Sequence, residues 1–102
     1  MFGPERHTKS YGTISRILEV CLNHPEDLTH LVGRAGVSYF DAKDYSEYLC
    51  DLGLLESKEL FTGTRDLGCV RRIYWTSYRG KILLAHLEAL KEIVDPRRRR
   101  YR

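Results

Sequence analysis

The chain has 102 residues and a mass of 11.9 kDa, the size of one small domain, which argues against functions that need two lobes or a wide interdomain cleft. Hydrophobic residues make up 42% of the sequence and charged residues 30%, a balance that predicts a folded globular domain rather than a disordered chain. The longest strictly apolar run, residues 82–85, is much shorter than a membrane-spanning helix, and the polar N-terminal segment has no secretory signal. We therefore expect a cytoplasmic protein with no membrane partner.

The net charge of +3 conceals an asymmetry along the chain. Residues 97–102 hold five of the 17 basic residues and no acidic residue, so residues 1–96 carry 12 basic against 14 acidic residues. Arginines crowded after a proline repel one another and do not pack, which predicts a flexible basic tail over residues 96–102. The tail is a candidate for contact with DNA phosphates, and the alternative is a terminus that only aids solubility. Its arginines are Arg97, Arg98, Arg99, Arg100 and Arg102.

Two helices are predicted near the start of the chain, after a flexible arm over residues 1–11. The apolar stripe of an amphipathic helix runs through residues 14–23, with Thr13 in position to be its N-cap. A shorter helix follows, in which residues 25–27 supply the proline and acidic residues typical of a first turn and Gly36 is the terminator.

A third helix follows the second almost directly. Ser38 and Asp41 form a start of the capping-box type, and the apolar pattern after them predicts a helix over residues 39–52 that Gly53 ends. Only two or three residues separate this helix from the one before it. Two helices joined by so short a turn, with the longer one second, indicate a helix-turn-helix.

The remainder of the sequence predicts a hairpin and one more helix. Residues 54–60 and 70–76 have the composition of strands, and residues 62–68 between them are typical of a turn. Residues 77–95 are helical in pattern and form the longest predicted helix. The expected fold class is therefore α+β, mainly α: a winged helix-turn-helix of three helices and a β-hairpin wing, with a long C-terminal helix.

Three motifs add detail to this prediction: A-G-V-S-Y at 35–39, L-C-D-L-G-L-L at 49–55, and Y-W-T-S-Y-R-G at 74–80. The last one fits a Y-x-x-[ST]-x-[KR]-G signature that leads from the wing strand into the next helix. Over about residues 12–94, the chain resembles the small archaeal winged-helix DNA-binding proteins, including the 10a-type chromatin-associated dimers. The resemblance implies a homodimer that is held by a C-terminal antiparallel coiled coil and binds double-stranded DNA.

The sequence itself also favours a dimer. The last helix carries two neighbouring apolar stripes, more than one small domain can cover. We therefore expect a winged-helix domain over residues 12–80 and a dimerisation helix over residues 77–95, the alternative being a monomer that folds this helix fully back. The second stripe is Ile82, Ala89 and Ile93, with His86 between. The first stripe is the predicted dimer interface. It is a heptad seam with spacings of 4, 3 and 4, formed by Leu83, Leu87, Leu90 and Val94.

Candidate DNA contacts lie on the third helix and on the wing. The N-terminal half of the second helix in a helix-turn-helix enters the major groove, and the side chains pointing away from its apolar stripe are Tyr39, Phe40, Lys43, Ser46 and Glu47. The wing arginines in position to contact phosphates or the minor groove are Arg65, Arg71 and Arg72. Residues 39–51 contain one basic residue against four acidic ones, which repels phosphates. Either Glu47 or Asp44 could use that charge to accept a hydrogen bond from a cytosine amine. The alternative is a solvated helix face or a protein-binding surface.

The register of the second strand has two solutions. Simple alternation sends Ile73 and Trp75 inward, whereas the signature sends Tyr74 and Thr76 inward and exposes Trp75. We favour the register of the signature.

Catalysis has no support in the sequence. The four histidines form no H-E-x-x-H motif, there is no G-x-S-x-G, and the glycines do not form a phosphate loop. The three cysteines, Cys21, Cys50 and Cys69, are odd in number and lack a C-x-x-C spacing, which argues against a disulfide framework or a zinc site. We expect no catalytic residue, cofactor or metal. Cys21 and Cys50 are interpreted as small buried residues, with a disulfide across a dimer as the alternative.

The expected function is that of a homodimeric protein that binds double-stranded DNA as a transcriptional regulator or chromatin-associated factor. It would be associated with the nucleoid of an archaeon or, if viral, located in the cytoplasm of the archaeal host. The alternative is a winged-helix module that binds another protein through the acidic helix over residues 39–52. DNA binding should depend on the arginines, and protein binding on Asp44 and Glu47.

Overall fold

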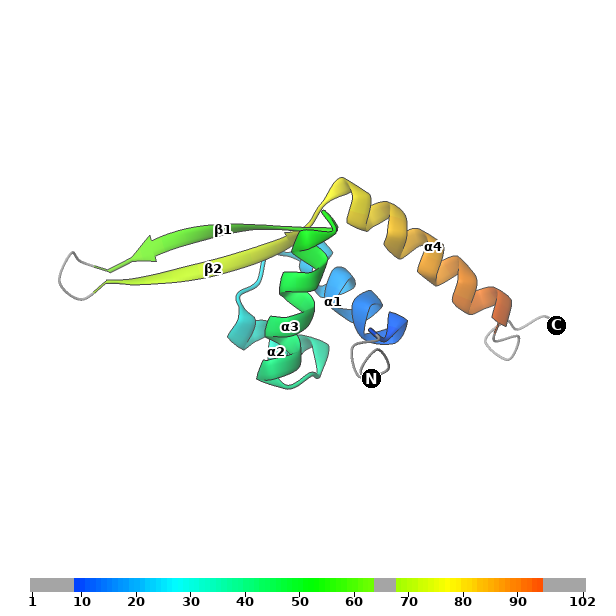
Figure 1. Cartoon of the computed structure of the whole chain (residues 1–102), viewed down its shortest axis with the longest axis horizontal. Coiled ribbons are helices and arrows are strands. Elements are labelled where there is room, and N and C mark those ends of the chain that lie inside the picture. The colour runs from blue at the N-terminus through cyan, green and yellow to red at the C-terminus, as the bar shows by residue number, and fades with distance from the viewer. Residues whose placement is uncertain (1–8, 64–67, 95–102) are drawn as a thin grey trace, which may run out of the picture.

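The computed structural model describes residues 9–63 and 68–94 (Figure 1). Its elements are α1 (Tyr11–Asn23), α2 (Leu28–Ala35), α3 (Tyr39–Asp51), β1 (Leu55–Thr62), β2 (Cys69–Thr76) and α4 (Tyr78–Val94). The two strands form an antiparallel hairpin that projects from the bundle of α1, α2 and α3, and α4 leaves the base of that hairpin in a different direction (Figure 1). The chain is therefore a winged helix-turn-helix, mainly α, as the sequence predicts. None of the described helices has the length and apolar composition needed to cross a membrane.

Two helix starts differ from the predictions. Ser10 rather than Thr13 is the N-cap of α1, because the Ser10 hydroxyl accepts a hydrogen bond from the backbone N–H of Thr13 at 3.3 Å. Asp27 is the N-cap of α2 and accepts from the backbone N–H of His30 at 2.9 Å, so residues 25–27 precede the helix. Ser10, Thr13 and Asp27 are all residue types that cap helices well. The local sequence therefore does not show which of two nearby candidates is the N-cap.

Helix α3, the second helix of the helix-turn-helix, agrees with its prediction to within one residue. The Ser38 hydroxyl accepts from the backbone N–H of Asp41 at 3.0 Å. Gly36 and Gly53, the predicted terminators of the second and third helices, have φ values of 69° and 76°. This left-handed backbone is readily adopted by glycine and ends each helix where expected.

The core lies between α1, α2, α3, the base of the hairpin and one face of α4. Tyr74 and Thr76 are buried, which confirms the inward residues of the signature's register. Trp75, which that register was expected to expose, is half-buried, as is Ile73. The Thr76 hydroxyl donates to the carbonyl of Leu18 at 2.7 Å, so this buried polar group is satisfied. The core residues are Ile14, Ile17, Leu18, Cys21, Leu31, Ala35, Ala42, Leu49, Leu54, Leu55, Tyr74, Leu84 and Leu87.

The segment between α1 and α2 pairs with the wing. The backbones of Glu26 and Tyr74 exchange two hydrogen bonds of 3.0 and 2.9 Å. The carboxylate of Glu26 is buried and contacts Arg34 Nε at 3.1 Å and His24 Nδ1 at 3.2 Å. A buried carboxylate needs such partners, and the bridge explains why Glu26 lies outside the helix in which it was predicted.

The hairpin turns into α4 at a tightly packed corner. The Ser77 hydroxyl accepts from the backbone N–H of Gly80 at 3.0 Å and donates to the carbonyl of Gly53 at 2.7 Å, while the backbone N–H of Ser77 donates to the carbonyl of Leu54 at 3.0 Å. A Cβ atom at Gly80 would lie 2.2 Å from that same Leu54 oxygen. The serine and glycine of the 74–80 signature are therefore required by this contact.

The orientation of α4 corrects the predicted dimer seam. Leu87 is buried against the core of its own chain, together with Leu84, and is not available to a second copy. Leu83 is half-buried against the same core, while Leu90 is exposed. The side chain of Val94 lies outside the described set. The apolar stripe facing away from the core is the second one, which comprises Ile82, Ala89 and Ile93 with His86 between them.

Substitution of Gly80 by alanine should destabilise the fold by about 1–3 kcal/mol or more, because the new Cβ overlaps backbone rather than a flexible side chain. Gly33→Ala is the matched control, since Gly33 lies within α2 and its added Cβ would meet nothing within 4 Å. This control should be neutral or stabilising by up to about 1 kcal/mol. Urea unfolding of both variants tests the expectation, and equal stabilities would contradict it.

Neutralising Asp27 should lower stability in a pH-dependent way. Burial alone would raise the pKa of Asp27, but hydrogen bonds from the backbone and ring of His30, with the charges of His30 and Arg71, outweigh burial and lower it. The stabilisation is therefore present above the ordinary aspartate pKa of about 3.9 and is lost as the pH falls through the lowered value.

Asp27→Asn keeps a good N-cap and removes only the charge. At neutral pH this variant should be less stable than the wild type by about 1 kcal/mol. The free energies of unfolding of the two proteins should converge in acid. A difference that persists unchanged at pH 2 would contradict the electrostatic explanation.

Candidate nucleic-acid interface

Helix α3 and the wing line a continuous surface of three adjoining hollows, which we call the α3–wing surface. The central hollow, of about 390 Å³, is lined by Glu47, Cys50, Asp51, Ser57, Arg72 and Tyr74. A hollow of about 110 Å³ is lined by Phe40, Lys43, Asp44 and Glu47. A third, of about 230 Å³, is lined by Asp27, Leu28, Thr29, Tyr39, Val70, Arg71 and Arg72. Glu47 and Arg72 each belong to two hollows, so the three form one surface.

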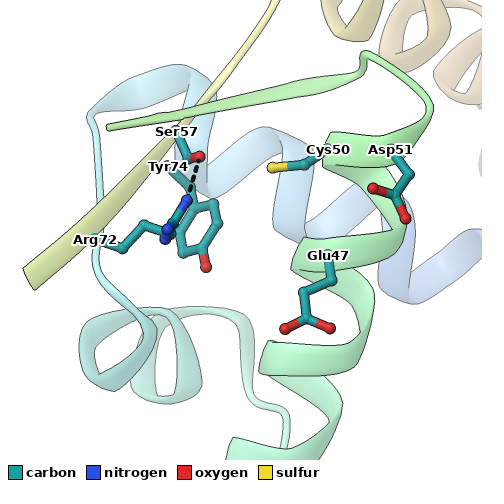
Figure 2. A pocket seen from close by; sticks show the side chains of 6 residues that line it. All are labelled: Glu47, Cys50, Asp51, Ser57, Arg72 and Tyr74. Atoms are coloured by element: carbon teal, nitrogen blue, oxygen red, sulfur yellow. Dashed lines mark hydrogen bonds between the residues drawn. The ribbon is translucent and has the colours of Figure 1, made fainter. Parts of the chain in front are cut away.

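The central hollow joins the two elements directly. Figure 2 shows Arg72 and Tyr74 of β2 facing Glu47 and Cys50 of α3 across it. The Arg72 guanidinium donates to the Ser57 hydroxyl at 3.2 Å and to the Glu59 carboxylate at 2.6 Å. A cationic group from the wing therefore lies next to the acidic side of α3.

Two of the four acidic residues of α3, Asp44 and Glu47, are paired with cations. Asp44 forms an ion pair with Lys9, and Glu47 lies 3.4 Å from Lys43 one turn before it. Lys9 precedes α1, and its ammonium lies 4.8 Å from the centre of the Tyr45 ring, within range of a cation–π interaction. The count of charges within the helix therefore overstates its repulsion of phosphates, because Lys9 comes from a different part of the chain.

One predicted DNA contact is wrong. Ser46 is fully buried, and its hydroxyl has no hydrogen-bond partner within the described part of the chain. It lies between Ala42 and Leu49 on the core-facing stripe of α3, at the helical spacings of four and three residues. Leu52, the hydrophobic residue at the end of the predicted helix, is exposed instead.

The other predicted contacts are accessible where the structure describes them. Tyr39, Lys43 and Glu47 are exposed on α3. Arg71 and Arg72 are half-exposed and paired, Arg71 with Asp27 at 2.8 Å and Arg72 with Glu59. The Arg72–Glu59 pair is exposed on both sides and is worth at most about 1 kcal/mol, so Arg72 can exchange its carboxylate for a phosphate. The predicted contacts outside the described residues are Arg65, Arg97, Arg98, Arg99, Arg100 and Arg102.

The cysteine thiols near this surface are not activated. Burial, with the nearby Glu26 and Cys50, raises the pKa of Cys21 to about 12. Burial also raises the pKa of Cys50. Both thiols are neutral at neutral pH. Cys21 is buried in the core as predicted, whereas Cys50 is half-buried and lines the central hollow. Among the described residues, no cluster of three or more histidine, cysteine or acidic side chains has the arrangement of a metal site.

Comparison with solved structures shows what this fold is similar to. The DNA-binding protein Sso10a-2 from Sulfolobus solfataricus is 23% identical, with 86% of this chain and 84% of that chain covered and a TM-score of 0.63. The circadian clock associated protein Pex from Anabaena is 19% identical, with 86% and 82% covered and a TM-score of 0.58. No family model matches the chain, and no curated protein matches it in sequence. At these identities the likeness establishes the fold, a winged helix of the kind found in small DNA-binding proteins.

Proposed function

We propose that the protein binds double-stranded DNA as a homodimer and acts as a transcriptional regulator or a nucleoid-associated chromatin factor. The observation that carries the proposal is the α3–wing surface, in which the exposed N-terminal half of α3 lies beside a projecting hairpin that bears Arg71 and Arg72. The similarity in fold to Sso10a-2, which is described as a DNA-binding protein, supports it.

In this proposal α3 enters the major groove and the wing contacts the backbone. The hollow between α2 and the wing suits a phosphate because it combines two arginines with the start of α2, where the helix dipole is positive. Asp27 in the same hollow opposes an anion, so Arg71 has to leave it on binding. The expected basic tail over residues 96–102 would add further phosphate contacts.

A second candidate, a protein-binding module that uses α3, is favoured by one observation. Phe40 is exposed beside Asp44 and Glu47, a combination that also suits a partner with an apolar, basic surface. The ion pairs of those two carboxylates with Lys9 and Lys43 reduce the attraction for such a partner. We therefore rank DNA binding first.

The proposed dimer uses the outward stripe of α4. An antiparallel pairing centred between residues 87 and 88 sets Ile82 against the partner's Ile93 and His86 against the partner's Ala89. Each large side chain near the centre then lies opposite a small one, which allows close packing. The stripe is exposed in the single chain, with Ile93 at 70%, and pairing would remove this apolar surface from water.

Ile93→Asp should convert the dimer to a monomer without unfolding the chain, because Ile93 makes no contribution to the buried core. Glu88→Ala, an exposed position beside the stripe, is the control and should stay dimeric. Leu87→Asp, by contrast, should lower the stability of the monomer itself, since burial of a leucine is worth about 1.5–3 kcal/mol. Light scattering at tens of micromolar measures the mass, and a monomeric wild type would contradict the proposed dimer.

Arg72→Ala should weaken binding to all duplexes by a similar factor and reduce the slope of log affinity against log salt by about 0.9, the value for one phosphate contact. Lys81→Ala is the control. Lys81 is exposed on α4, outside the α3–wing surface, so its loss removes one positive charge and should change neither the affinity nor the salt slope. Deletion of residues 97–102 should reduce the slope further.

Gel-shift titrations of a random duplex at two salt concentrations test the proposed DNA binding. The wild type should bind, with an affinity that falls as the salt concentration rises. Absence of binding by the wild type would refute the function, and an unchanged slope in the Arg72 variant would remove that residue from the interface.

A further inference from the structure

We propose that Phe40 recognises the 5-methyl group of thymine in the major groove, and that α3 reads pyrimidine edges rather than guanine. The inference rests on the proposed DNA binding and names the determinant of base preference within the same surface. It starts from the exposure of Phe40, which at 74% is among the highest of the large hydrophobic side chains in the described residues.

The position of Phe40 suits base contact. It is the second residue of α3, in the turn that a helix-turn-helix presents first to the base edges. Its ring borders the small hollow shared with Lys43, Asp44 and Glu47. A methyl group that projects from the floor of the major groove fits such an apolar wall, and phenylalanine is among the side chains that contact thymine methyls.

The composition of α3 offers few of the side chains that usually read purines. Guanine is usually read by arginine or lysine and adenine by asparagine or glutamine. The helix, with the sequence YFDAKDYSEYLCD, contains no arginine, asparagine or glutamine. Its one lysine, Lys43, forms an exposed ion pair with Glu47. The outward face is therefore mainly aromatic rings and carboxylate oxygens, with Lys43 as its single cation.

Those groups match the chemistry of pyrimidines. A carboxylate of Asp44 or Glu47 can accept a hydrogen bond from the N4 amine of cytosine, and Phe40 can contact the methyl of thymine. Both acidic residues line the hollow beside Phe40. The ion pairs with Lys9 and Lys43 lower the repulsion between these carboxylates and the DNA backbone. The outward face of α3 has more acidic than basic residues, which is unfavourable for binding phosphates, but its side chains suit a DNA site that contains pyrimidines.

The test removes the methyl group from the DNA. Duplexes that the wild-type protein enriches from a random pool are resynthesised with each thymine replaced in turn by uracil, which lacks only that methyl. At one position or more, the replacement should weaken wild-type binding about three- to fivefold, the effect expected from losing one buried methyl-sized group. A 5-methylcytosine in place of that uracil, paired with guanine, separates the methyl from the rest of the base pair and should recover part of the loss.

Three variants assign the effect to the ring. Phe40→Ala should bind the thymine and uracil duplexes equally, and Phe40→Leu, which keeps an apolar contact, should retain a preference for thymine. Tyr78→Ala is the matched control, because Tyr78 is 75% exposed at the start of α4, beyond the opposite end of α3 (Figure 1). This control should discriminate between thymine and uracil as the wild type does.

The outcomes separate the inference from the function on which it rests. Equal wild-type binding to thymine and uracil at every position would overturn the inference and leave DNA binding intact. The same holds if Phe40→Ala keeps the thymine preference, or if it binds every duplex as tightly as the wild type, since Phe40 would then serve another surface. A wild type that binds no duplex at all refutes the proposed function itself.

Discussion

The arrangement of the wing and the C-terminal helix depends on one close contact, in which the backbone of Gly80 packs against the carbonyl of Leu54. No Cβ atom fits at that point, and Ser77 completes the corner by bonding to the carbonyls of Gly53 and Leu54. The end of α3, both strands of the hairpin and the start of α4 meet there. The direction of the wing and the rotation of α4 about its axis are therefore set together.

That rotation decides which parts of the molecule face outward. It places Leu84 and Leu87 in the core and leaves Ile82 and Ile93 exposed, so two stripes of the same chemistry take different roles. Because the outward stripe is open to a second copy and Leu87 is not, the proposed dimer and the folded monomer use largely separate residues. The domain can then fold before it associates.

Ion pairs between separate elements cross the α3–wing surface. Lys9 from the start of the chain pairs with Asp44 of α3, and Arg71 of the wing pairs with Asp27 ahead of α2. These pairs offset part of the negative charge that α3 and Asp27 bring to the surface. Affinity in the proposed complex would then come from arginines that exchange partners, and base preference from the exposed ring of Phe40.

The sequence by itself determined the order and type of the elements, because caps, terminators and periodicity act over a few residues. Ser38 begins α3, and Gly36 and Gly53 follow the ends of α2 and α3, as the residues around each of them predict. Only the tertiary structure decided that Ser46 faces the core and that Leu87 is unavailable to a partner. Periodicity shows that a helix has apolar stripes, but contacts between distant segments choose the stripe that is buried.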